Sequence, residues 1–270
     1  MSKIEAILCI DIDGTLIDST ERVHPNDVQQ LLDFPKSIQP FLTTGRSLFS
    51  ARGELHKHGL FRPSPIPLAG VYMNGGAAYL PNEVLYIRHL FSTSMRDDLI
   101  TLAEKNPQST FIFFSLDAGY VVNPNQYSQH FAKSHYLNPH LTGAEEVPEE
   151  IIKVMIVEKN RPVIEQIARN AAGLNAEMVY SLPHLFEINP LGITKAQTLT
   201  KLIEEMELKD VPIYAAGDGE NDLSLFELSR ASFAPGSAHP SILGKADHVI
   251  KSEKEGLLLP ILKYITENEI

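Results

Sequence analysis

Short apolar runs that end in polar turns are the first recurring pattern along the chain. Residues 7–12 are almost continuously apolar, and the run ends in Asp11-Ile12-Asp13-Gly14-Thr15. A run of this length and composition predicts a strand buried on both faces, as in a parallel sheet, with a turn at its carboxyl end.

The same strand-to-turn-to-helix order recurs twice more. Residues 38–42 lead into Thr43-Thr44-Gly45-Arg46 and a helix predicted over 47–58, and residues 213–216 lead into Gly217-Asp218-Gly219-Glu220-Asn221-Asp222 and a helix that begins at Leu223. The three polar turns therefore follow the carboxyl ends of predicted parallel strands. That edge is where open α/β sheets bind their ligands.

The pattern changes between residues 78 and 189, where longer alternating strands are separated by helical stretches. The strands are predicted over 110–114, 119–122 and 153–157, and the helices around 94–105 and 162–172. After residue 189 the first pattern resumes with a helix near 194–206. We therefore predict an α/β protein: a Rossmann-like parallel-sheet core from residues 1–77 and 190–270, with an inserted α+β cap over 78–189.

Composition and charge narrow the functional classes. The 270 residues include 23 Lys and Arg against 34 Asp and Glu, a formal charge of −11, with 43% hydrophobic residues and one cysteine, Cys9. This is typical of a globular protein, and the negative charge argues against binding nucleic acid or an anionic membrane. Residues 4–10 are too short for a secretory signal, and the apolar stretch 257–262 is too short to span a bilayer. We expect a cytoplasmic protein.

Carboxylates gather at the predicted turns. Asp11 and Asp13 are two residues apart, so a regular strand would place both side chains on one face. Their mutual repulsion favours a cation between them, and Mg²⁺ prefers such oxygen ligands. Asp218, Asn221 and Asp222 supply further oxygens from another strand end. The alternative interpretation of Asp11 to Thr15 is a capped turn, because Asp and Gly are common there.

The ordered set of motifs resembles the haloacid dehalogenase-like phosphatase superfamily, and more narrowly its Cof-type sugar phosphatase branch. The motifs are Asp11-Ile12-Asp13-Gly14-Thr15, Thr44-Gly45-Arg46, Lys195 and Gly217-Asp218-Gly219-Glu220-Asn221-Asp222, supported by the strings Asn74-Gly75-Gly76-Ala77, Gly192-Ile193-Thr194-Lys195 and Phe233-Ala234-Pro235-Gly236. The resemblance covers essentially the whole chain. It implies Mg²⁺ as the cofactor and a cap inserted between the second and third motifs.

The resemblance also implies catalytic roles. Asp11 would be the nucleophile that accepts the phosphoryl group. Asp13 would act as general acid and then base, and its backbone carbonyl would contact the metal. Thr44 would bind phosphoryl oxygens, and Lys195 would offset negative charge on Asp11 and the phosphoryl group. Asp218 would be a further metal ligand.

The remaining assignments keep alternatives open. Asn221 and Asp222 would either bind the metal directly or orient a water that does. Gly45 and Arg46 would help bind the phosphate through their amides, although the Arg46 side chain is also compatible with a substrate-side group, a structural group or a solvated helix start. Asn74 would contact substrate or cap, or form a turn. One departure from the branch is Gly236-Ser237-Ala238, where many members carry Gly-Asn-Ala.

These motifs lead to the expected function. We expect Mg²⁺-dependent hydrolysis of small phosphate monoesters, with sugar phosphates as the favoured class, through an aspartyl-phosphate. A phosphomutase that uses the same intermediate and a non-catalytic regulatory protein that binds Mg²⁺ and phosphate are the alternatives. The expected partner is a small phosphorylated metabolite. The sequence leaves the oligomeric state open.

Overall fold

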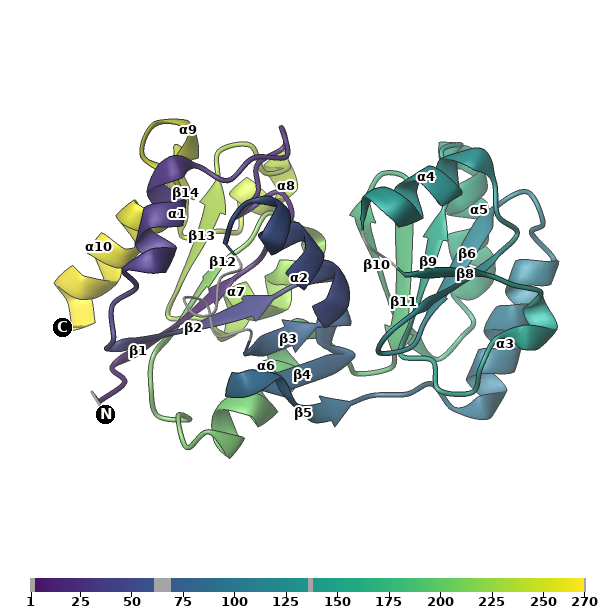
Figure 1. Cartoon of the computed structure of the whole chain (residues 1–270), viewed down its shortest axis with the longest axis horizontal. Coiled ribbons are helices and arrows are strands. Elements are labelled where there is room, and N and C mark those ends of the chain that lie inside the picture. Colours follow the sequence, from purple (N-terminus) through teal and green to yellow (C-terminus); the bar gives the residue numbers. More distant parts are fainter. Residues whose placement is uncertain (1–2, 61–68, 136–137, 270) are drawn as a thin grey trace.

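Two β-sheets organise the chain, as the computed structural model of residues 3–60, 69–135 and 138–269 shows (Figure 1). The larger sheet has eight strands in the order β14-β13-β12-β1-β2-β3-β4-β5. Its neighbours pair in parallel from β14 to β3, and β4 and β5 add an antiparallel edge. The strands are β1 (Ala6–Ile10), β2 (Ile38–Thr43), β3 (Gly70–Tyr72), β4 (Ala77–Leu80), β5 (Val84–Arg88), β12 (Ile213–Ala216), β13 (Ala231–Pro235) and β14 (His248–Ile250).

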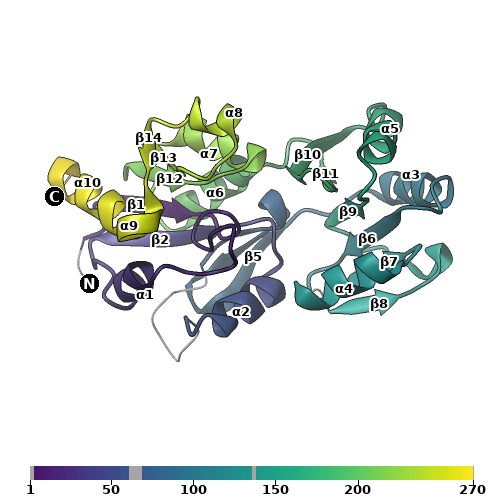
Figure 2. The ribbon, with the colours of Figure 1, turned by 90° about the horizontal axis from the view of Figure 1, so that it is seen from above.

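Helices cover both faces of this sheet (Figure 2). One face packs against α1 (Pro25–Leu32), α2 (Leu48–Lys57) and α10 (Leu258–Glu269), and the other against α6 (Lys195–Glu205), α7 (Leu223–Leu228) and α8 (Pro240–Leu243). A short helix, α9 (Ser252–Glu255), precedes α10. In β1, Leu8 belongs to the first cluster and Cys9 to the second. The predicted burial of this strand on both faces is confirmed.

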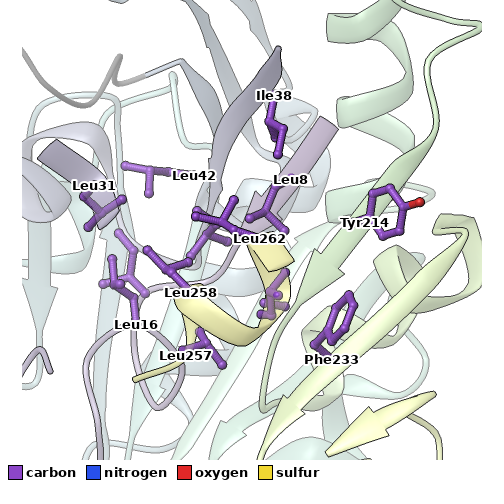
Figure 3. Packing of buried hydrophobic residues seen from close by; sticks show 14 of the residues in the cluster. Leu8, Leu16, Leu31, Ile38, Leu42, Tyr214, Phe233, Leu257, Leu258 and Leu262 are labelled. Atoms are coloured by element: carbon purple, nitrogen blue, oxygen red, sulfur yellow. The ribbon is translucent and has the colours of Figure 1, made fainter. Parts of the chain in front are cut away.

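The carboxyl-terminal helix α10 packs against the beginning of the chain. Figure 3 shows Leu258 and Leu262 of α10 in the same cluster as Leu8 of β1 and Leu31 of α1. Complete burial of a leucine contributes roughly 1.5–3 kcal/mol. Asp27 of α1 also accepts the N–H groups of Leu257 and Leu258 at 2.9 and 2.7 Å, so it caps the start of α10.

The smaller sheet lies in the middle of the sequence and has the strand order β10-β11-β9-β6-β7-β8. Helices α3 and α5 contribute buried residues to the cluster on one face, and α4 contributes Phe131 and Ala132 to the cluster on the other. The elements are α3 (Thr93–Glu104), β6 (Thr110–Phe114), β7 (Gly119–Val122), α4 (Gln126–Ser134), β8 (Pro139–Leu141), β9 (Lys153–Val157), α5 (Arg161–Ala171), β10 (Ala176–Leu182) and β11 (Leu185–Pro190).

Four short 3₁₀ helices complete the described elements: η1 (Met73–Gly75), η2 (Pro81–Glu83), η3 (Ala144–Glu146) and η4 (Glu220–Asp222). The predicted α/β class is confirmed, and the strands predicted over 110–114, 119–122, 153–157 and 213–216 match β6, β7, β9 and β12. Among the residues that the structure describes, no helix is long and apolar enough to cross a membrane.

The boundary expected at residue 78 falls inside the larger sheet. β4 and β5 form a hairpin that continues this sheet beyond β3, so residues 77–88 belong with it. We call residues 93–190, which carry the smaller sheet, the insert, and the rest of the described chain the core. The hairpin of β10 and β11, which closes the insert, was not predicted. Apolar and polar residues do not alternate along β10, and in the structure nearly all of its residues are half-buried.

Candidate active site

The predicted acids meet at the carboxyl edge of the larger sheet. Asp11 follows β1 directly, and its N–H donates to the carbonyl of Ala216 at the end of β12, so the turns after these strands are neighbours. The two turns approach each other at Gly14, where a Cβ would collide with the carboxylate of Asp218. Thr15 donates its hydroxyl hydrogen to Asp218 at 3.2 Å. The first and last motifs therefore form one surface.

Lys195 connects the acids. It is the first residue of α6, its side chain is fully buried, and its Nζ donates to Oδ1 of Asp11 at 2.8 Å and to Oδ1 of Asp222 at 2.7 Å. Burial opposes the charge of this ammonium, but the two carboxylates outweigh burial and raise its pKa. Lys195 is therefore a fixed positive charge 184 residues from Asp11 in sequence.

Three carboxylates, those of Asp11, Asp218 and Asp222, each place an oxygen within 4.8 Å of the others. Burial raises the pKa of Asp11 well above its usual range. Lys195 lowers this pKa, whereas the charges of Asp222 and Asp218 raise it. Burial and the charge of Asp222 raise the pKa of Asp218 to about 7. Carboxylates that repel in this way favour a divalent cation, and their oxygens suit Mg²⁺, so these residues fit a metal of this kind.

Asp222 already has hydrogen-bond partners. Its Oδ2 accepts the N–H groups of Asp218 and Gly219, both at 3.1 Å, while its Oδ1 accepts from Lys195. Asp222 therefore shapes the turn that presents Asp218. Its neighbour Asn221 directs its amide to Oδ1 of Asn74 at 3.0 Å. The metal roles predicted for both residues stay predictions.

Asp13 lies apart from the three clustered carboxylates. Its carboxylate accepts two hydrogen bonds from Arg46, from Nε at 2.7 Å and from Nη2 at 2.6 Å. Partial desolvation raises the pKa of Asp13, but the charge and hydrogen bonds of Arg46 outweigh it and hold the pKa below its usual range. The Asp13 side chain is 52% exposed, whereas that of Arg46 is 9% exposed and also pairs with Glu54 at 3.2 Å. The alternative that Arg46 is a solvated helix start is wrong.

The turn after β2 is built around Thr44 and Gly45. Thr44 is fully buried, and its hydroxyl oxygen accepts the N–H of Arg46 at 3.1 Å. Its own N–H donates to the carbonyl of Val71 in β3. Arg46 joins this turn to Asp13, and the phosphate-binding roles of Thr44, Gly45 and Arg46 stay predictions.

Asn74 occupies a left-handed backbone conformation, with φ of 57°. Asparagine tolerates this region better than most residues, which fits the turn-forming interpretation. Its side chain is nevertheless buried between the core and the insert, where Nδ2 donates to Glu187 of β11 and Oδ1 accepts from Asn221. Asn74 therefore contacts the insert as well as forming a turn.

Two buried charged residues of the insert, which the sequence did not predict as part of the site, lie at this edge. Lys153 begins β9 and Glu187 lies within β11, and both interrupt runs of apolar residues. A charge inside an apolar strand was the available signal, because such a residue is almost never fully buried without a partner. The Nζ of Lys153 lies 2.9 Å from Oε2 of Glu187 and donates to the carbonyl of Gly45 at 2.8 Å.

Comparisons with known proteins agree with this architecture. The family model for haloacid dehalogenase-like hydrolases matches residues 8–260. The chain is 28% identical to the uncharacterized hydrolase C215.10 of Schizosaccharomyces pombe over 97% of this chain and 91% of that protein. It is 25% identical to the putative phosphatase YxeH of Bacillus subtilis, with 92% and 94% covered.

Solved structures share the fold. The sugar phosphatase BT4131, described as a member of subclass IIB, superposes with a TM-score of 0.78 at 21% identity and covers 97% of this chain and 98% of its own. A haloacid dehalogenase-like hydrolase from Bacteroides thetaiotaomicron gives 0.80 at 18% identity, with 96% and 99% covered. The chain belongs to the haloacid dehalogenase-like hydrolase family, which confirms the resemblance, and it is an enzyme.

Proposed function

From this membership of the haloacid dehalogenase-like hydrolases, we propose that the protein is a Mg²⁺-dependent phosphatase of small phosphate monoesters. The observation that carries the proposal is the contact of Lys195 with both Asp11 and Asp222, within a cluster of carboxylates at the sheet edge. A nucleophile, a fixed positive charge and a set of oxygen ligands are the parts that phosphoryl transfer requires.

The first step forms an aspartyl-phosphate. A carboxylate oxygen of Asp11 attacks phosphorus, the bond from phosphorus to the ester oxygen breaks, and the leaving alkoxide takes a proton from Asp13. Lys195, which donates to Asp11 at 2.8 Å, favours the ionised form of this nucleophile against the burial that raises its pKa. Asp11, Asp218 and the backbone carbonyl of Asp13 would hold Mg²⁺, and Asn221 and Asp222 would bind it directly or orient a water that does. The ion would supply positive charge that offsets the phosphoryl oxygens. Thr44, Gly45 and Arg46 bind those oxygens.

The second step releases phosphate. Asp13 takes a proton from water, the water oxygen attacks phosphorus, and the bond between phosphorus and Asp11 breaks, which restores the Asp11 carboxylate and the protonated form of Asp13. In the structure Arg46 holds Asp13 as a carboxylate, the form that this second step requires. The acid role in the first step requires Arg46 to leave Asp13, and the phosphoryl oxygens are the anions that compete for its guanidinium.

We propose sugar phosphates as the preferred substrate class and the insert, residues 93–190, as a cap that selects the leaving group. Two observations support this. BT4131, which shares the fold, is described as a sugar phosphatase. A cavity of about 170 Å³ lies between the core and the insert, and its lining includes Asn74, Glu177, Asn189, Lys195 and Asn221. Carboxylate and amide groups are the partners that sugar hydroxyls use.

Phosphate release from a panel of small phosphate esters tests the proposal, measured with saturating Mg²⁺ and with a chelator. We expect turnover that requires Mg²⁺ and that falls by about 10³-fold or more in Asp11→Asn. Asp98→Asn, which changes an exposed aspartate of α3 in the same way, is the matched control. Equal release by Asp11→Asn and wild type would remove Asp11 as nucleophile.

Two other outcomes would replace the proposal. Isomerised product with little free phosphate, and strict dependence on a bisphosphate, would identify a phosphomutase. Saturable ester binding with no turnover by any member of the panel would identify a binding protein.

A further inference from the structure

A continuous path of hydrogen bonds connects the insert to two turns of the core. It begins at the carbonyl of Gly45, which accepts from Lys153, and continues through the ion pair of Lys153 with Glu187. Asn74 donates to the same Glu187 carboxylate and accepts from Asn221. The path therefore leaves the turn after β2, crosses two strands of the insert and returns to the core beside Asp222.

The ion pair within this path is fully enclosed. The side chains of Lys153 and Glu187 are 1% and 3% exposed. Burial of two charges is costly unless hydrogen bonds satisfy their remaining donors and acceptors. Here Gly45 and Asn74 of the core do so, together with Ser181 of β10, whose hydroxyl donates to Oε1 of Glu187 at 3.1 Å. The buried pair of the insert therefore depends on the core for two of its hydrogen bonds.

Gly45 lies directly against the buried pair and Asn74. A Cβ at this position would lie 3.1 Å from Oδ1 of Asn74 and 3.6 Å from both Nζ of Lys153 and Oε2 of Glu187. The carbonyl of Gly45 belongs to the peptide group that carries the N–H of Arg46, so a fixed carbonyl also fixes that amide. Arg46 in turn holds Asp13.

We propose that Lys153 and Glu187 are positioning residues that fix the Gly45 turn and Asn221 when the insert is seated on the core. This deepens the proposed function and rests on it, because the turn is the expected phosphate-binding element. The pair acts through Gly45 and Asn74, and its own hydrogen bonds are made within the protein. An insert that lifts from the core breaks the contact with Gly45, so the turn loses this restraint and keeps only its hydrogen bonds within the core.

The double variant Lys153→Met/Glu187→Gln tests this with little disturbance of the fold. It leaves no unpaired buried charge, and the new glutamine retains an oxygen that can accept from Asn74, so the contact with Gly45 is the main loss. The matched control is Arg88→Met/Glu150→Gln, which alters another ion pair between core and insert, at 2.8 Å but exposed. Lys153→Arg is the conservative variant, since its guanidinium still donates to both partners.

We expect the double variant to fold, with kcat lowered by about 10²-fold and a smaller change in KM, while the control and Lys153→Arg stay near wild type. Hydrogen exchange of a peptide spanning residues 44–47 should be at least about tenfold faster in the double variant, with β1 unchanged. A folded double variant with wild-type kcat and wild-type exchange at 44–47 would show that the pair is only structural.

Exchange in the wild-type protein gives a second measurement that needs neither variant nor turnover. With increasing urea, the amides of residues 44–47 should become exchangeable in the same opening event as β9 and β11. An opening of 44–47 with its own, lower urea dependence would overturn the proposal. Absence of phosphate release by the wild type would refute the proposed function alone, because both exchange tests are independent of activity.

Discussion

Two buried lysines, one in the core and one in the insert, show how differently the two regions use charge. Lys195 of the core pairs with Asp11 and Asp222, and Asp218 lies in the same cluster, so negative charge is in excess. Among the described residues, Lys153 of the insert has one ion-pair partner, Glu187. Burial lowers the pKa of Lys153 despite Glu187, whereas the carboxylates raise that of Lys195.

The difference follows from the number of carboxylates around each ammonium. An excess of carboxylates makes the core site receptive to a cation and then to a phosphoryl group. A one-to-one pair carries no excess charge that would attract a ligand. The core site is therefore suited to chemistry and the insert pair to positioning, and four predictions test this contrast.

The largest effect on stability should come from replacing one partner of the buried ion pair between Lys153 and Glu187. Lys153→Met leaves Glu187 buried without its cation, and we expect the free energy of unfolding to fall by about 3–5 kcal/mol. Lys153→Met/Glu187→Gln should recover most of this loss. Urea unfolding followed by circular dichroism measures both. Arg88→Met, which breaks an exposed pair with Glu150, should cost less than about 1 kcal/mol. Similar losses in Lys153→Met and Arg88→Met would contradict this interpretation.

The core lysine should matter most for catalysis. Lys195→Met removes the charge that Asp11 and Asp222 share, and we expect kcat for phosphate release to fall by about 10²–10³-fold. The control is Lys263→Met, because Lys263 has a side chain 73% exposed on α10. If the two variants turned over equally, Lys195 would have no catalytic role.

Metal binding should distinguish the two regions directly. Mg²⁺ at about 100 times its dissociation constant should stabilise the wild type by about 2.7 kcal/mol, and a chelator should reverse this. Asp218→Asn should abolish the shift because it removes a carboxylate from the cluster, whereas Glu187→Gln should retain it. Thermal unfolding with and without MgCl₂ measures the effect. An equal shift in both variants would place the metal elsewhere.

The smallest effect concerns Asp13, whose pKa in the folded state is lowered by Arg46. A lowered pKa stabilises the folded state at pH values above the pKa of the unfolded state, about 3.9. This stability is lost as the pH falls through the pKa of the folded state. Since Asp13 is 52% exposed, we expect no more than about 1 kcal/mol. The stability difference between wild type and Asp13→Asn should therefore shrink below about pH 4. A difference that stays constant from pH 7 to pH 3 would show that Arg46 does not stabilise the carboxylate.

Much of the core could be predicted because its signals are local. The apolar run before Asp11 predicted β1, and the small and polar residues from Gly217 to Asp222 predicted the turn after β12. The ion pair of Arg46 with Asp13 could not be predicted, since the two residues are 33 apart in sequence. The same limit applied to Lys153, which meets Gly45 across 108 residues.

The sequence by itself determined which strands are buried on both faces, where polar turns follow them and which residue types those turns carry. Periodicity and turn chemistry act over a few neighbouring residues, so they can be read without knowledge of the fold. Only the tertiary structure decided how many carboxylates surround each buried lysine, that β4 and β5 extend the larger sheet and that Lys153 reaches the Gly45 turn. Those outcomes depend on how the sheets pack together, because electrostatic interaction is set by distance and burial in space.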